Sequence, residues 1–163
     1  MITNMINFYA GIGSRNTPEN ILNIMNLISI KLESDSFCLR SGHAIGADTA
    51  FESNIKNKEI FEANDASLKA IEYASNFHNN WNNCSNYVKK LHGRNAMIIL
   101  GKNLDQPVKF VVCWTQNGKD MGGTGLSIRI AKHNNIPVFN LYNENVLTRF
   151  QNYINSDIIN MMI

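Results

Sequence analysis

The chain has 163 residues, of which 44% are hydrophobic and 17% are charged, and its formal net charge at pH 7 is +2. This composition excludes a disordered chain and predicts one globular domain over residues 1–163. The small net charge excludes a strongly basic nucleic-acid coat protein but allows a local basic groove.

Strand and helix patterns alternate along the chain. The expected strands cover residues 7–10, 37–40, 58–62, 110–114 and 137–141, and the expected helices cover residues 18–34, 48–57, 66–75, 85–100, 125–134 and the tail from 144. Thr17 is the predicted N-cap of the first helix, with Pro18 at its first helical position. The alternation predicts an α/β fold with a Rossmann-like, open, mostly parallel sheet and helices on both faces.

The cysteines and the apolar stretches exclude several protein classes. Cys38, Cys84 and Cys113 are odd in number and scattered, which argues against a disulfide framework. There is no Cys-x-x-Cys pair, so we expect no metal site, and nothing indicates another cofactor. No stretch is apolar for long enough to span a membrane and no basic leader precedes Tyr9, so we expect a cytoplasmic protein with no membrane partner.

Three glycine-containing turns follow predicted strands. Glycine lets a ligand approach the backbone N–H groups, and a helix N-terminus adds unpaired donors. Because the carboxyl ends of parallel strands meet at one edge of a sheet, the three turns predict a single phosphate-binding cradle. Its candidate residues are Gly11, Gly13, Ser14 and Arg15 in the first turn, Ser41, Gly42, His43 and Asp48 in the second, and Gly122, Gly123, Thr124 and Gly125 in the third.

The first and third turns differ from two common nucleotide motifs. Gly11 and Gly13 begin a dinucleotide fingerprint, but Asn16 stands where its third glycine would be. Ser14 offers a hydroxyl and Arg15 offers a forked contact to phosphate. After the third turn, Leu126 and Ser127 occupy the Walker positions, which excludes a P-loop NTPase.

Two carboxylates and several side chains near the turns are further candidates. Asp48 and Glu52 share a helical face, where they would bind ribose hydroxyls or act on a glycosidic carbon; a helix cap and a solvated glutamate are the plain alternatives. The segment from His92 to Asn95 is expected to interrupt its helix. The other ligand-binding candidates are Arg94, Asn95, Trp114 and Thr115, with Trp114 either stacking on a base or packing in the core.

The three turns, in this order, resemble those of the SLOG superfamily. That group includes the Rossmann-like domain of the DNA-processing protein DprA (Smf), the LOG phosphoribohydrolases and ligand-sensing domains of antiphage systems. Within that group the chain resembles more closely the small stand-alone DprA-like proteins common in phages, over residues of about 8 to 141. The resemblance implies a phage protein in the host cytoplasm that binds a nucleotide-type ligand and pairs with a second copy.

The resemblance also bears on catalysis. LOG enzymes carry the pattern Gly-Gly-x-Gly-Thr-x-x-Glu, whose glutamate takes part in N-glycosidic cleavage. Here Leu126 stands at the fifth position and Arg129 at the glutamate position. Whether the chain is an enzyme is therefore left open.

Three functions follow from these features. The first is binding of an ADP-ribose-like, cyclic or mononucleotide ligand, as a sensor or sponge of a nucleotide immune signal. The alternatives are a nucleotide N-glycosidase that uses Asp48 or Glu52, and DprA-like binding of single-stranded DNA. We also expect a homo-oligomer, because the chain ends with an apolar group comprising Ile158, Ile159, Met161, Met162 and Ile163.

Overall fold

The computed structural model describes residues 5–162, with side chains for residues 5–156. Within this range, five parallel strands form one sheet in the order β3-β2-β1-β4-β5. The strands are β1 (Asn7–Gly11), β2 (Phe37–Ser41), β3 (Lys58–Ile60), β4 (Val111–Cys113) and β5 (Val138–Asn140). The helices are α1 (Glu19–Ser34), α2 (Ala47–Glu52), α3 (Leu68–Ser75), α4 (Asn86–Leu100), α5 (Gly122–His133) and α6 (Glu144–Met162), with short 3-10 turns η1 (Ala63–Asp65), η2 (Trp81–Asn83) and η3 (Gln116–Gly118).

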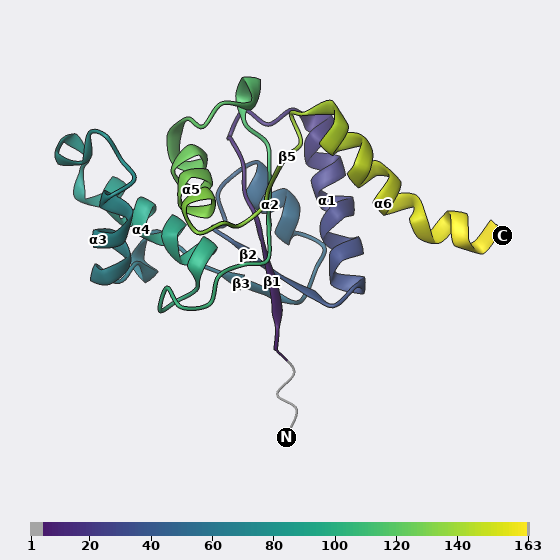
Figure 1. Ribbon diagram of the computed structural model, residues 1–163, viewed down its shortest axis with the longest axis horizontal. Coiled ribbons are helices and arrows are strands. Elements are labelled where there is room, and N and C mark those ends of the chain that lie inside the picture. The colour runs from purple at the N-terminus through teal and green to yellow at the C-terminus, as the bar shows by residue number, and fades with distance from the viewer. Residues whose placement is uncertain (1–4, 163) are drawn as a thin grey trace.

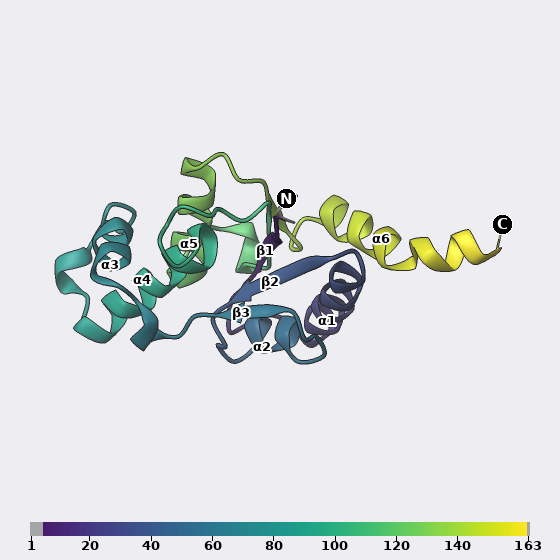
Figure 2. The same ribbon diagram turned by 90° about the horizontal axis from the view of Figure 1, so that it is seen from below.

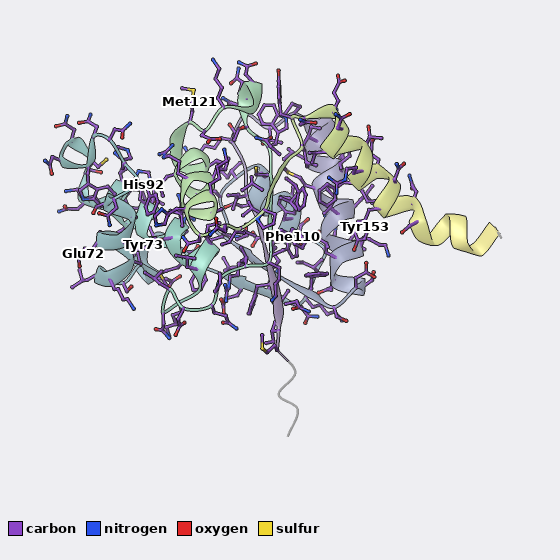
Figure 3. All side chains as sticks on the ribbon, viewed as in Figure 1. Glu72, Tyr73, His92, Phe110, Met121 and Tyr153 are labelled. Atoms are coloured by element: carbon purple, nitrogen blue, oxygen red, sulfur yellow. The ribbon has the colours of Figure 1, made fainter. Side chains whose placement is uncertain are left out.

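Helices cover both faces of the sheet, as predicted. Successive strand residues point to opposite faces, so Tyr9 and Val112 pack with α1 and α2, whereas Ala10 and Val111 pack with α4 and α5. Figure 1 and Figure 2 show these two helical layers on either side of the strands. The side chains fill both layers, with Phe110 near the sheet and His92 on the α3–α4 side (Figure 3). The Rossmann-like α/β prediction is confirmed.

The predicted start of α1 and the predicted end of α2 are wrong. Pro18 takes the N-cap position of α1, and the Thr17 hydroxyl donates to the Ser14 carbonyl at 2.6 Å instead of capping the helix. Helix α2 ends at Glu52, and the N–H groups of Lys56 and Asn57, which were expected to be helical, donate to Glu33 Oε1 at 2.7 and 2.6 Å. This anchor to α1 replaces helical pairing.

The predicted break in α4 and the predicted loop before α5 are also wrong. Helix α4 runs through residues 92–95 without interruption. A Cβ atom at Gly93 would lie 2.6 Å from Ile71 Cγ1, so this glycine permits the close packing of α3. Gly122 to Gly125 form the first turn of α5, and the Gly125 N–H donates to the Met121 carbonyl at 3.0 Å.

Helix α6 begins beside α1 and then projects away from the body of the molecule (Figure 1). Partly buried Val146, Leu147 and Phe150 pack against the α1 core. The apolar side chains at 158–163, on which the prediction of a homo-oligomer rests, lie outside the described residues. Among the helices of residues 5–162, none combines the length and apolarity needed to cross a bilayer.

Candidate functional site

A cavity of about 530 Å³ opens at the carboxyl edge of the sheet. It adjoins the ends of β1 and β4, where the strand order reverses and where ligands of open α/β sheets bind. Its volume is in the range of small-molecule sites. It is lined by Ile12, Gly13, Ser14, Arg15, Ala44, Asp48, His78, Val88, Leu91, His92, Arg94, Asn95, Met121, Gly122, Gly123, Thr124 and Ser127.

The turn after β1 forms one wall of the cavity. The Ser14 N–H donates to the Trp114 carbonyl at 3.1 Å, which fastens the turn to the end of β4. The Ser14 Oγ accepts from the Asn16 N–H at 3.1 Å, so its own hydroxyl proton is available to a ligand. A Cβ atom at Gly13 would lie 2.6 Å from Ala47 Cβ, so glycine is required where the turn passes α2.

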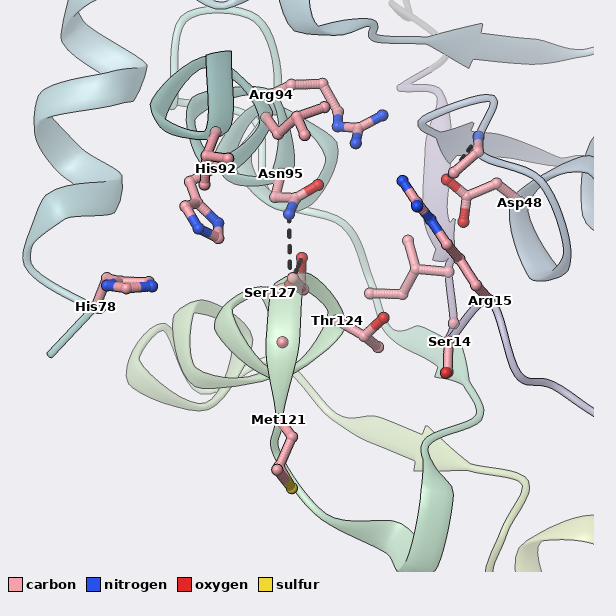
Figure 4. A pocket seen from close by; sticks show the side chains of 17 residues that line it. Ser14, Arg15, Asp48, His78, His92, Arg94, Asn95, Met121, Thr124 and Ser127 are labelled. Carbon is pink, nitrogen blue, oxygen red and sulfur yellow. Dashed lines mark hydrogen bonds between the residues drawn. The ribbon is translucent and has the colours of Figure 1, made fainter. Parts of the chain in front are cut away.

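The first turn of α5 forms the opposite wall. The carbonyl of Gly123 accepts hydrogen bonds from Asn95 Nδ2 and Ser127 Oγ, both at 3.3 Å (Figure 4). The first N–H groups of an α-helix have no partner within the helix, and they carry the positive end of its dipole. The fixed orientation of this turn therefore gives the cavity donors suited to an anion.

Asp48 and Arg94 meet at Gly42, between the turn after β2 and helix α4. Asp48 Oδ2 accepts from the N–H groups of Gly42 and Ala44 at 3.1 and 3.3 Å. Arg94 Nη1 donates to the carbonyls of Gly42 and Phe61 at 2.6 and 3.4 Å. Asp48 does not cap α2, whose N-cap position is Gly46.

Burial governs the charges of this pair. Burial raises the pKa of Asp48 to about 6, although Arg94 and the two N–H groups act in the opposite direction. Burial also lowers the pKa of Arg94, with Asp48 opposing and Arg15 adding to the shift. Figure 4 shows Arg15 and Arg94 extending toward the Asp48 carboxyl. Two guanidinium groups around one carboxyl make this part of the cavity net positive.

Four sequence-predicted candidates lie outside the cavity lining and serve the scaffold. Gly11 allows close packing, since a Cβ atom there would lie 2.6 Å from Phe51 Cγ. Ser41 Oγ donates to the Gly11 carbonyl at 2.6 Å. A Cβ atom at Gly125 would lie 2.4 Å from the Asp120 carbonyl carbon. Gly42 positions Asp48 and Arg94 through its backbone.

The other four candidates outside the lining pair with one another, with β5 or with the turn that follows β5. His43 Nδ1 is hydrogen bonded to Glu52 Oε1, and neither residue is among the cavity-lining residues. The Thr115 hydroxyl accepts from Asn140 Nδ2 at 2.6 Å. The Trp114 ring packs edge to face with Tyr142, with ring centroids 6.3 Å apart, in line with a core role rather than base stacking.

Sequence reasoning missed most of the α4 wall of the cavity. Val88, Leu91 and His92 lie on the same face of α4 as the predicted Asn95, and the expected break at 92–95 concealed that helical spacing. The others missed are Ile12, Ala44, His78, Met121 and Ser127. Burial, together with the charges of His78, Arg129 and Arg94, lowers the pKa of His92 to about 4, so its ring is neutral at pH 7.

Arg129, which stands at the LOG glutamate position, has a structural role. Its Nε donates to the Phe77 carbonyl at 3.0 Å and its Nη1 to the Asp120 carbonyl at 3.1 Å. These bonds fasten the segment between α3 and α4 to α5. Arg129 is not among the cavity-lining residues.

Comparison with solved structures finds a likeness to DNA processing protein A (DprA) from Helicobacter pylori, whose structure was described for its single-stranded DNA binding mode. The two share 16% sequence identity with a TM-score of 0.59, over 94% of this chain and 81% of that one. At this identity the likeness shows a DprA-like Rossmann fold. Family sequence models and curated proteins give no match.

Proposed function

We propose that this chain binds a nucleotide-derived ligand in the cavity at the carboxyl edge of the sheet. The observation that carries the proposal is the pairing of two donor groups across one cavity: the Ser14–Arg15 turn and the first turn of α5. A phosphate between them would meet the Ser14 hydroxyl, the Arg15 guanidinium and helix N-terminal N–H groups.

The rest of the cavity suits a nucleoside. Val88 and Leu91 provide apolar surface for a base, and the Asp48 carboxyl would accept hydrogen bonds from ribose hydroxyls. ADP-ribose-like, cyclic and mononucleotide ligands share this combination of phosphate, sugar and base. Retention of such a ligand without turnover would make the chain a sensor or sponge of a nucleotide signal.

The first test is a ligand panel. Purified protein is incubated with mononucleotides, ADP-ribose and cyclic nucleotides, and protein-bound and free material are separated for mass spectrometry. We expect intact ligand at one or fewer per site. Free base and sugar phosphate accumulating beyond the protein concentration would instead indicate an N-glycosidase, with Asp48 as the carboxyl positioned to act.

Arg15→Ala tests where the phosphate binds. Arg15 is exposed, so its loss leaves the core intact. We expect affinity for the nucleotide found in the panel to fall at least tenfold, because a charge-assisted contact contributes about 1.5–3 kcal/mol. Lys102→Ala, an exposed cation outside the cavity lining, is the control. Equal affinities for both variants and the parent would refute this placement.

Single-stranded DNA binding is the second candidate, favoured by the likeness to H. pylori DprA. Two cations that could contact DNA lie apart: Arg94 is buried in the cavity wall, and the Lys109 N–H donates to the Phe8 carbonyl near the start of β1, at the far edge of the sheet. A short strand entering the cavity would use the nucleotide contacts. Oligothymidylate binding that weakens steeply with salt, without mononucleotide binding, would favour this function.

A further inference from the structure

Three potential metal ligands gather at the edge of the cavity beside α4. His78 and Cys84 flank η2 and His92 lies on α4, and one ligand atom from each falls within 4.8 Å of the others. Cys84 Sγ lies 3.9 and 3.8 Å from the two ring nitrogens of His78. The ring centroids of His78 and His92 are 4.9 Å apart. Their spacing in the sequence is His-x5-Cys-x7-His, which differs from the Cys-x-x-Cys spacing of common zinc sites.

His92 supplies an independent observation. The residue is 7% exposed, and its Nδ1 is buried without a hydrogen-bond partner among the described residues. A buried polar atom without a partner costs about 1–3 kcal/mol. Packing against Trp81 accounts for the ring's apolar surface but leaves the nitrogen unsatisfied. Coordination to a cation would satisfy it.

We propose that His78, Cys84 and His92 bind a Zn²⁺ ion. Two imidazoles and one thiolate are a donor set that zinc prefers, and the Cys84 thiol loses its proton on binding. Zinc bonds of about 2.0–2.3 Å at tetrahedral angles separate ligand atoms by about 3.3–3.6 Å. The Cys84–His78 separations are already close to that range. Coordination through His78 Nδ1 replaces the hydrogen bond it accepts from the Asn80 N–H at 3.1 Å.

The fourth position of this zinc is open to the cavity. His78 and His92 both line the cavity, as Figure 4 shows, and three protein ligands leave one tetrahedral position for water or an anionic oxygen. The zinc site stands on its own geometry and does not rest on the proposed nucleotide binding. If both are present, the ion adds positive charge to the cavity beside the first turn of α5.

Metal titration of untagged protein tests the site. Metal is first removed from the protein with a chelator. Zn²⁺ affinity is then measured by competition with a chromophoric chelator, and Co²⁺ is added in place of Zn²⁺ for absorption spectroscopy. We expect one metal per chain, intense visible absorption of tetrahedral Co²⁺ and a thiolate-to-cobalt charge-transfer band. Azide is expected to alter the visible bands. An unchanged spectrum would overturn the open fourth position.

The test uses Cys84→Ser and His78→Ala, because both side chains are only partly buried, whereas a substitution of the buried His92 would also disturb the packing. Each should weaken Zn²⁺ binding at least about tenfold, and Cys84→Ser should abolish the charge-transfer band. Cys38→Ser, which alters a half-buried cysteine in β2, is the matched control and should bind as the parent does. No metal uptake by the parent, or equal uptake by Cys84→Ser, would overturn the proposal.

Discussion

At the scale of the residue, Asp48 combines a titratable carboxyl group, 6% exposure and a place in the cavity wall. Burial raises its pKa from 3.8 to about 6. The folded state therefore keeps a proton that the unfolded chain releases between about pH 4 and pH 6. The stability that this proton provides is complete below pH 4 and is lost as pH rises through 6.

We predict that the free energy of unfolding falls by about 2 kcal/mol more in the parent than in Asp48→Asn between pH 4 and pH 7. Asparagine can still accept the N–H bonds of Gly42 and Ala44 but does not titrate. Urea denaturation of both proteins across this range measures the difference. The other carboxyl groups are common to both proteins, so their contribution to the pH dependence drops out of the comparison. Parallel pH profiles would show that Asp48 titrates normally.

Gly42→Ala should destabilise the protein by about 1–3 kcal/mol. Its added Cβ would lie 2.2 Å from Arg94 Nη1 and 2.9 Å from Asp48 Oδ2, and both side chains are fixed by hydrogen bonds to the Gly42 backbone. Gly123→Ala is the control, since its Cβ would approach only the Asn95 amide at 3.3 Å, and alanine favours the helix. Urea midpoints should shift down for the first and not for the second.

At the scale of the element, Arg129 of α5 is hydrogen bonded to the segment between α3 and α4. Arg129→Met removes the hydrogen bonds to the carbonyls of Phe77 and Asp120 while keeping apolar bulk. We expect faster amide hydrogen exchange over residues 76–84, with the sheet unchanged. Lys132→Ala is the control, since it loses only its ion pair with Asp120 at 3.0 Å. Equal exchange in both variants would contradict the anchoring role.

At the scale of the whole molecule, α6 extends beyond the body of the protein (Figure 2). The sequence predicts self-association through its apolar end, and a helix that leaves its own sheet could reach a second copy. We predict that the full chain is a dimer or larger, and that a chain ending at Ser156 is a monomer with the same fold. Light scattering coupled to size-exclusion chromatography measures both masses. A monomeric full chain would contradict the prediction.

The sequence by itself determined the fold class and much of the cavity lining. Strand and helix periods specified the alternating elements because each period buries one face. Small residues after β1 and in the first turn of α5 marked the edge of the sheet where the cavity opens. Gly13, Ser14, Arg15, Asp48, Arg94, Asn95 and Gly122 to Thr124 do line the cavity. Only the tertiary structure decided which neighbours serve the scaffold, because Trp114 and Thr115 pair with residues distant in sequence and Glu52 pairs with His43 in the turn before α2.

The grouping of His78, Cys84 and His92 likewise came from the tertiary structure. Their spacing follows no short metal motif, and an extended turn and one helix face had to fold together before their ligand atoms lay within 4.8 Å. Local periodicity fixes which residues form an element and which face is buried. Side-chain pairing between elements depends on packing at long range, and so the chemistry of the cavity wall emerged only in three dimensions.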